Sequence, residues 1–358
     1  MDALLEEWID RVRSASSRRE ALRIRAGGTK DFYGNTPRGA VFDPRGWSGV
    51  ESYEPSELVI TARGGTPLAL IQERLAAQRQ MLAFEPPHFG AGATLGGCIA
   101  AGLSGPRRTA AGYTYGSLRD AVLGARLLDG QGRLLRFGGT VIKNVAGYDV
   151  SRLLAGSLGI LGVIVDVSLK VLPMPAMERS LRFSMSEQAA LENLQQWGGE
   201  PLPLSASCWL ENTLWLRLSG AAPAVEVASR ALGGEVIDDD VAAGFWHDVR
   251  EQRHAWFDGK SPLWRVSLPC TAEPVAIDSP QLIEWGGALR WLRSEAPAAQ
   301  IRALAHELGG HATLFRSGEQ REHAFTPLSA PLLAIHQRLK QEFDPARIFN
   351  PGRLYAEL

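Results

Sequence analysis

The chain has 358 residues, of which 45% are hydrophobic and 22% charged, and its 38 basic residues nearly balance its 39 acidic ones. This composition excludes disordered and fibrous proteins, and the lack of a long basic block excludes the usual electrostatic signature of nucleic-acid binding. Since a single hydrophobic core rarely grows to this chain length, we expect two lobes.

The cysteines and the apolar segments indicate where in the cell the protein resides. Cys98, Cys208 and Cys270 lie far apart, which fits neither a disulfide framework nor the CxxC spacing of a metal or iron–sulfur site. The N-terminus lacks the basic start and apolar run of a secretory signal. The most apolar stretch contains Asp166 and Lys170 and falls short of the ~20 residues that span a bilayer. We expect a cytoplasmic protein without direct membrane insertion, attached to the inner membrane, if at all, through partner subunits.

Taken in chain order, the first half predicts a domain that mixes strands and helices. An N-terminal helix precedes a strand that enters a glycine turn in LRIRAGGTKDFYG, and short strands and a helix follow. LRDAVLGARLLDGQGRLLRF then predicts two strands joined at residues 129–132. A last apolar strand ends at Pro173 and Pro175. We therefore predict a first domain over residues 1–172.

The second half also mixes strand and helix patterns. It predicts a hairpin around Glu211 and Asn212, helices in PAVEVASRALGG and AAQIRALAHELGG, and a strand in PLWRVSLP. The tail is an amphipathic helix ended by Pro345 and then an extended segment. We predict an α+β fold with a smaller α+β cap domain over residues 173–325 and a C-terminal part over residues 326–358.

Two glycine-rich loops suggest a site for a dinucleotide. Gly27 and Gly28 can adopt positive φ and leave room for a pyrophosphate against backbone N–H groups, Thr29 adds a hydroxyl, and Lys30 adds a positive charge. An ordinary turn at the end of a strand also explains this pair of glycines. The second loop, GAGATLGGCIAAGLSG, contains six glycines near three prolines, more than close helix packing requires. A flat ring can lie against such a backbone.

Other nucleotide and metal motifs fail on spacing. Leu95 stands where a Rossmann fingerprint needs its third glycine, and His254 stands where a P-loop ending at Lys260 needs its first. His306 and His311 are five residues apart, so they do not share a helix face as zinc ligands do. We expect no metal site.

Read in order, the segments resemble the FAD-binding domain of the vanillyl-alcohol oxidase and p-cresol methylhydroxylase (PCMH-type) superfamily. AGGTK resembles its first pyrophosphate loop, and PPHFGAGATLGGCIAAGLSG resembles its second, with a T-x-G-G sequence. YGSLRDAVLGARLLDGQG and GYDVSRLLAGSLGILGVIVDVSLKVLP resemble the segments that follow, and FDPARIFNPGRL resembles the C-terminal segment that returns to the FAD domain. The resemblance implies a two-lobed PCMH-type fold.

The resemblance also implies which residues contact FAD. Those implied are Ala26, Gly27, Gly28, Thr29 and Lys30 at the pyrophosphate, Thr94, Leu95, Gly96, Gly97, Gly102, Ser104 and Gly105 along the flavin, and Gly156, Ser157, Gly159, Gly162 and Val163 near the adenine. Relatives that tether FAD covalently often use histidine or cysteine in these loops. The first loop has neither, so we expect non-covalent FAD, with His88 and Cys98 as the residues to exclude.

Within the superfamily the sequence is most similar to the smaller FAD-binding subunits of bacterial glycolate oxidases. Leu158 replaces a glutamate of larger relatives, and the histidine-rich metal motif of 2-hydroxyacid dehydrogenases has no counterpart in residues 176–325. The resemblance implies oxidation of glycolate, a small 2-hydroxyacid, to glyoxylate together with a larger catalytic flavoprotein and an iron–sulfur subunit. A structural assembly subunit with a vestigial FAD site and a stand-alone FAD-dependent sugar or alcohol oxidase remain alternatives.

A cluster in the cap offers candidates for substrate chemistry. The segment FWHDVREQRHAWFDGKSPLWRVSLP suggests Arg265 as a ligand of a substrate carboxylate and His254 as a base for the alcohol proton. Arg265 stands out because a cation within an apolar strand needs a partner. His311 and Arg316 are weaker candidates. The alternative is a half-exposed helix whose tryptophans, Trp246 and Trp256, lie in the core or at a subunit contact.

Overall fold

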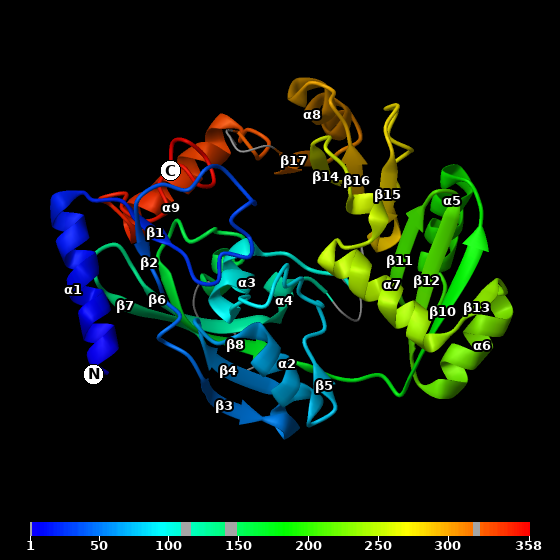
Figure 1. The fold of residues 1–358 in the computed structure, drawn as a ribbon, viewed down its shortest axis with the longest axis horizontal. Coiled ribbons are helices and arrows are strands. Elements are labelled where there is room, and N and C mark those ends of the chain that lie inside the picture. The colour runs from blue at the N-terminus through cyan, green and yellow to red at the C-terminus, as the bar shows by residue number, and fades with distance from the viewer. Residues whose placement is uncertain (1, 109–115, 140–148, 318–322) are drawn as a thin grey trace.

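The computed structural model describes residues 2–108, 116–139, 149–317 and 323–358, and it has two lobes (Figure 1). The helices span Ala3–Arg18 (α1), Leu68–Ala76 (α2), Leu95–Ala101 (α3), Leu118–Ala121 (α4), Glu187–Gly198 (α5), Ala222–Leu232 (α6), Asp239–Glu251 (α7), Ala298–Glu307 (α8) and Ala330–Phe343 (α9). The strands of the first lobe span Leu22–Ile24 (β1), Ala40–Phe42 (β2), Val50–Glu54 (β3), Val59–Arg63 (β4), Gln80–Met81 (β5), Val122–Leu128 (β6), Leu134–Gly138 (β7), Val163–Lys170 (β8) and Leu172–Pro173 (β9). Those of the second span Met177–Ser184 (β10), Leu204–Leu210 (β11), Thr213–Gly220 (β12), Glu235–Ile237 (β13), Leu263–Ser267 (β14), Gln281–Glu284 (β15), Leu289–Arg293 (β16) and His311–Arg316 (β17).

An antiparallel five-stranded sheet, in the order β3-β4-β8-β6-β7, organises the first lobe. Strand β8 is buried on both faces because its side chains alternate: Ile164 packs into the core that contains residues of α2 and α3, whereas Val163 and Val165 pack with residues of α1. Strands β1 and β2 pair in parallel beside α1 (Figure 1). The sheet thus supports helices on both sides.

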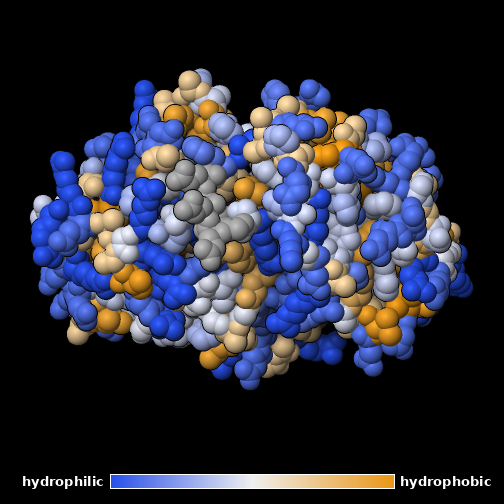
Figure 2. Space-filling model, turned by 45° about the horizontal axis from the view of Figure 1, so that its top comes forward, coloured by the Kyte–Doolittle hydropathy of each residue, from blue (hydrophilic) through white to orange (hydrophobic). Residues whose placement is uncertain are grey.

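An antiparallel eight-stranded sheet, in the order β13-β10-β12-β11-β15-β16-β14-β17, organises the second lobe. Leu214, Leu216 and Leu218 of β12 pack in one core with residues of α5 and α6, whereas Trp215 stacks on Phe245 of α7. Helix α7 therefore covers the opposite face, the one toward the first lobe (Figure 1). Figure 2 shows both lobes covered mainly by hydrophilic side chains, with an indentation between them.

A partly buried network of ions joins the lobes. The Glu85 carboxylate, in the first lobe, accepts hydrogen bonds from the Arg107 backbone N–H (2.8 Å) and from the Arg217 guanidinium of β12 (2.9 Å). Arg107 also donates to Glu178 of β10 (2.6 Å). Burial alone would raise the pKa of Glu85, but the charges of Arg217 and Arg107 lower that pKa to about 2. Complementary charges therefore hold the first lobe and the sheet of the cap together.

The α+β, two-lobed fold predicted from the sequence is confirmed, as are the two predicted hairpins, β6–β7 and β11–β12. Glu211 and Asn212 both have positive φ at the second turn. One local prediction was wrong: residues 118–121 form the short helix α4 rather than a strand, because the Asp120 carboxylate accepts the Ser117 backbone N–H (2.8 Å) and caps a helical turn. The two large sheets use residues 50–170 and 177–316, while the exact domain limits stay a prediction.

Candidate functional site

The first loop, the second loop and the C-terminal segment together line a groove in the first lobe, which we call the glycine groove. It consists of two adjoining cavities of about 100 and 70 Å³. The residues that line both are Ile24, Ala26, Gly97, Ala100, Leu158 and Asn350. Strand β1 delivers the first loop to this groove, and α3 begins beneath it, at Thr94, whose hydroxyl caps the Gly97 N–H (3.3 Å).

Consecutive backbone amides of the first loop are available for a ligand. Within the described residues, the N–H groups of residues 26–30 donate to no protein acceptor, although the amides before and after them, at Arg25 and Asp31, do. All five residues line the larger cavity. Unpaired backbone N–H groups are costly when buried, and several that converge form an anion-binding nest. The loop therefore suits a phosphate.

Glycine is required where the two loops touch. A Cβ at Gly27 would lie 1.6 Å from the Gly92 carbonyl oxygen, so any other residue would push the loops apart. Gly28 has φ of +67°, in the left-handed region that glycine adopts without strain. The close contact at Gly27 and the positive φ at Gly28 explain why the turn contains two glycines. An ordinary turn at the end of a strand would not require both.

The other residues predicted to contact FAD divide into three groups. Gly96, Gly159, Gly162 and Val163 line the smaller cavity. Ser104 and Gly105 lie instead in a pocket between the lobes, described below. Leu95, Gly102, Gly156 and Ser157 line neither the groove nor that pocket. Leu95 is buried in the core, and Gly102 packs against the Gly156 backbone, so these residues support the groove from behind.

Sequence reasoning missed Asn350 as a groove residue, although it had singled out the surrounding NPG segment. The Asn350 side chain accepts the Ile24 N–H (2.8 Å) and donates to the Leu158 carbonyl (2.6 Å). Its neighbour Arg353 donates to backbone carbonyls of the first loop, among them that of Asp31 (3.1 Å). The C-terminal segment thus clamps the first loop and the Leu158 turn together.

The two residues examined for covalent attachment lie outside the groove. Cys98 is 2% exposed in the core of the first lobe, and burial raises the pKa of its thiol to about 11, which disfavours the reactive thiolate. The His88 ring hydrogen-bonds to Gln72 (2.8 Å), and burial lowers its pKa. Neither residue lines the glycine groove.

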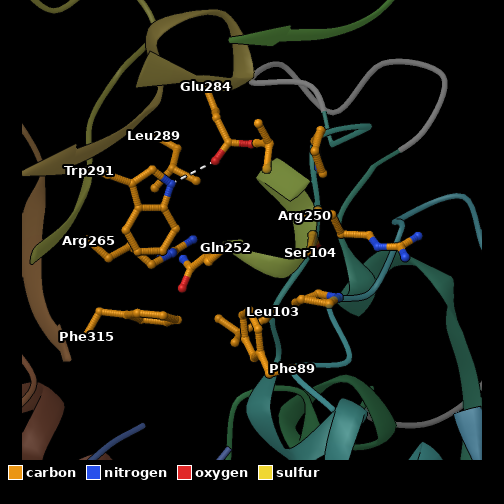
Figure 3. Close-up of a pocket in the computed structure, with 14 residues that line it drawn as sticks. Phe89, Leu103, Ser104, Arg250, Gln252, Arg265, Glu284, Leu289, Trp291 and Phe315 are labelled. Atoms are coloured by element: carbon orange, nitrogen blue, oxygen red, sulfur yellow. Dashed lines mark hydrogen bonds between the residues drawn. The ribbon is translucent and has the colours of Figure 1, made fainter. Parts of the chain in front are cut away.

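A second cavity, of about 20 Å³, lies between the lobes, and we call it the interlobe pocket (Figure 3). The first lobe contributes Phe89, Leu103 and Ser104, and the cap contributes polar, charged and aromatic side chains. Those of the cap are Arg250, Gln252, Arg265, Glu284, Trp291 and Phe315. Helix α7 is fixed over the pocket because its Glu251 carboxylate accepts the Phe89 N–H (2.8 Å).

The structure separates the two residues predicted to act on substrate. Arg265 lines the interlobe pocket and lies over the Trp285 ring (5.3 Å). His254 does not line it; its Nδ1 accepts the Trp256 N–H (3.2 Å) at the start of a helical turn. Trp246 and Trp256 are buried, as the structural alternative expected. His311 is exposed, and Arg316 lies over the Phe32 ring (4.6 Å).

Two polar residues of the interlobe pocket were not predicted from the sequence. Gln252 ends α7, and Glu284 ends β15 and is 4% exposed. A single carboxylate in the apolar segment QLIEW was the signal available for Glu284. In the part of the chain that the structure describes, no cluster of histidine, cysteine and carboxylate side chains could hold a metal ion. No helix there combines the length and apolar character needed to cross a bilayer.

Comparisons with known proteins agree with this geometry. A family described as FAD binding domain matches residues 5–138. Glycolate oxidase subunit GlcE of Escherichia coli (strain K12) is 49% identical over 99% of this chain and 97% of that protein. Glycolate oxidase subunit GlcD of Bacillus subtilis (strain 168) is 38% identical over 74% of this chain and 68% of that protein.

Among solved structures, an alkyldihydroxyacetonephosphate synthase superposes with a TM-score of 0.65 at 16% identity, covering 97% of this chain and 75% of that one, which shows a shared fold. Fold and family together define an FAD-binding oxidoreductase of the PCMH type. Within that class, the chain belongs to the family of glycolate oxidase subunits that includes GlcE.

Proposed function

We propose that the glycine groove binds FAD non-covalently and that the first loop holds its pyrophosphate. The observation that carries this proposal is the row of unpaired amides at residues 26–30, which face a cavity beside the second glycine loop. Lys30 also lines this cavity, and its ammonium group donates to the His88 carbonyl (3.2 Å). Burial lowers the pKa of Lys30 below its usual value, and a bound anion would offset that cost.

We propose separate roles for the other predicted contacts that line the groove and for those that lie behind it. Thr94, Gly96 and Gly97 would lie along the flavin side of the cofactor, and Gly159, Gly162 and Val163 would accept its far end by backbone contact. Leu95, Gly102, Gly156 and Ser157 would act through packing. FAD, when bound, supplies the capacity to take up two electrons from a carbon substrate. The residues of this chain position it and keep water away.

We further propose that the chain works as the FAD-binding subunit of a glycolate oxidase complex, beside a larger catalytic flavoprotein and an iron–sulfur subunit, in the oxidation of glycolate to glyoxylate. The relatives named as glycolate oxidase subunits support this proposal. The proposed location is the cytoplasm, with any attachment to the inner membrane made through those partner subunits.

The test begins with the full chain, purified alone. We expect a yellow protein whose FAD leaves on denaturation, and a rise in thermal midpoint when FAD is added to stripped protein, because a ligand that binds only the folded state stabilises it. A colourless chain with no thermal shift would sink the FAD proposal in favour of an assembly subunit with a vestigial site.

Anaerobic glycolate then separates the remaining roles. Bleaching of the flavin by glycolate in the isolated chain would show turnover by this subunit itself. A yellow chain that bleaches only when the larger flavoprotein is present would show electron relay within a complex. Bleaching by sugars or simple alcohols and not by glycolate would favour the stand-alone oxidase.

A further inference from the structure

The interlobe pocket contains polar groups that the described protein atoms leave unsatisfied. Gln252 is 8% exposed, and its Oε1 is buried without a hydrogen-bond partner. Within the described residues, the half-buried Arg265 guanidinium forms no hydrogen bond or ion pair. It lies over the Trp285 ring (5.3 Å) and is attracted electrostatically by Tyr33 and Glu284. Polar groups removed from water cost free energy unless a partner meets them. Both line the same cavity (Figure 3).

Glu284 lines that cavity as a third polar group, opposite in charge to Arg265. One of its oxygens accepts the Trp291 indole N–H (2.7 Å), and the other accepts no hydrogen bond from the part of the chain that the structure describes. Although Arg265 is near enough to lower the pKa of Glu284, the two do not form an ion pair. The space between a cation, a carbonyl oxygen and a carboxyl group is therefore suited to a molecule that carries an anion and a hydroxyl.

We propose that the interlobe pocket binds a small 2-hydroxycarboxylate, with its carboxylate on Arg265 and its hydroxyl donating to Gln252 Oε1, and that Glu284 controls the affinity by its charge. This proposal rests on the proposed function, since it supplies the substrate class and the residues of that activity. In this proposal Gln252 and Glu284, and not His254, contact the hydroxyl group of the ligand.

The walls of the pocket limit the size of the ligand. A cavity of about 20 Å³ holds little more than one water molecule, so the side chains must yield slightly even to a two-carbon acid. Phe89, Leu103 and Phe315 close the side opposite Glu284 (Figure 3). We expect affinity to fall from glycolate to lactate to 2-hydroxyglutarate, since each added carbon meets these walls.

An adjoining cavity of about 420 Å³ shares Arg250 with the interlobe pocket. Its charged side chains are mostly paired: Arg217 binds Glu85 (2.9 Å), and Arg250 binds Glu251 (2.8 Å).

The charge of Glu284 decides how binding depends on pH. Burial raises the pKa of Glu284 to about 7, so the carboxyl is neutral below that pH and leaves the Arg265 cation free for the ligand. Above it, the Glu284 carboxylate repels the ligand and competes for Arg265. The groups that face Glu284 and Arg265 from neighbouring elements are Glu85, Cys208, Tyr33, Arg108 and His311.

The experiment measures glycolate binding to the FAD-loaded full chain by calorimetry between pH 6 and pH 8.5. Since a carboxylate of this kind is ionised throughout the range, we expect the affinity to fall by about tenfold as the pH rises through 7, because one proton is linked to binding. Glu284→Gln removes the ionisation and should bind with nearly constant affinity. Glu295→Gln, an exposed control, should keep the pH dependence.

Variants of the other two residues separate binding from folding. Arg265→Met should lower glycolate affinity at least tenfold, whereas Arg230→Met on the surface of α6 should not. Gln252→Met removes an unpaired oxygen, so the thermal midpoint should not fall. The same variant should weaken glycolate about fivefold and leave acetate, which has no hydroxyl, unchanged. A structural role alone would not produce this split.

Two results would overturn the inference while FAD binding, followed by its visible spectrum in the same samples, persists. One is wild-type protein that binds no glycolate, which would mean that the pocket holds only water. The other is a pH dependence that survives in Glu284→Gln. Loss of the flavin spectrum in wild-type protein would instead mark failure of the proposed function.

Discussion

At the scale of single residues, Gly27 is the position where one atom decides whether the glycine groove forms. Gly27→Ala places a methyl group 1.6 Å from the Gly92 carbonyl oxygen, and both are backbone positions that cannot turn aside. We expect a loss of about 3 kcal/mol in the free energy of unfolding, at the upper end for overpacking. FAD affinity should fall by at least about tenfold, because the loops must separate. Urea unfolding and FAD titration measure the two effects.

A matched substitution shows whether the effect belongs to the site. Gly244 lies inside α7, where a Cβ would meet nothing within 4 Å. Gly244→Ala should raise stability by about 0.5–1 kcal/mol, because alanine loses less chain entropy in a helix. Equal FAD affinity in Gly27→Ala and wild type would contradict the proposed role of the first loop.

Individual site residues were also harder to predict from the sequence than the glycine loops. The glycine loops could be predicted because turns and close backbone approach demand glycine locally. The interlobe pocket could be predicted only in part, through Arg265, since its other polar residues come from separate elements. His254 and Gln252 are two residues apart, and the end of α7 at Gln252, with φ of +53°, turns only the latter toward the pocket. No local pattern distinguishes them.

At the scale of elements, the buried Glu85 carboxylate links the first lobe to strand β12 of the cap. Glu85→Gln removes the charge that pairs with the buried Arg217 (2.9 Å), while Arg107 keeps its ion pair with Glu178 (2.6 Å). We expect the free energy of unfolding at pH 7 to fall by about 3 kcal/mol, since breaking a buried pair costs that much. Glu20→Gln, in an exposed pair with Arg18, should cost below about 0.5 kcal/mol. Chemical denaturation of the three proteins provides the comparison.

The same pair predicts a dependence on pH. The folded pKa of Glu85, about 2, lies below the 4.5 of an unperturbed glutamate, so the stabilisation from its charge is fully present above pH 4.5 and disappears as the pH falls toward 2. The difference in stability between wild type and Glu85→Gln should therefore shrink across this window. A difference that stays constant from pH 7 to pH 3 would show that the lost stability comes from packing rather than charge.

At the scale of the whole molecule, the two lobes, the two hairpins and several strands and helices could be predicted from the sequence, because alternating apolar residues and turn residues are local signals. What could not be predicted was how distant segments meet. The pairing of β1 with the C-terminal segment, at Leu22 and Phe349, joins residues more than three hundred positions apart. The resemblance to a known superfamily indicated this return, whereas hydrophobic periodicity alone did not.

The return of the C-terminal segment to the first lobe leads to a prediction for Asn350. Asn350→Ala leaves the Ile24 N–H and the Leu158 carbonyl without partners, so we expect a loss of about 2 kcal/mol in stability. FAD affinity should fall as well, because both partners border the groove. Asn193→Ala on α5, which loses a hydrogen bond within one helix, should stay within about 0.5 kcal/mol of wild type. Thermal unfolding with and without FAD provides the readout, and an unchanged FAD affinity would argue against the clamp.

The late position of this clamp affects how the protein is made. The first loop emerges from the ribosome before the cap, yet the residues that hold it, Asn350 and Arg353, follow the whole cap in the sequence. Domains commonly fold during synthesis in order from the N-terminus. Here the first lobe must wait, incomplete, while the entire cap is translated. Termination before Asn350 would therefore leave a chain that contains every glycine of both loops and still cannot close its cofactor site.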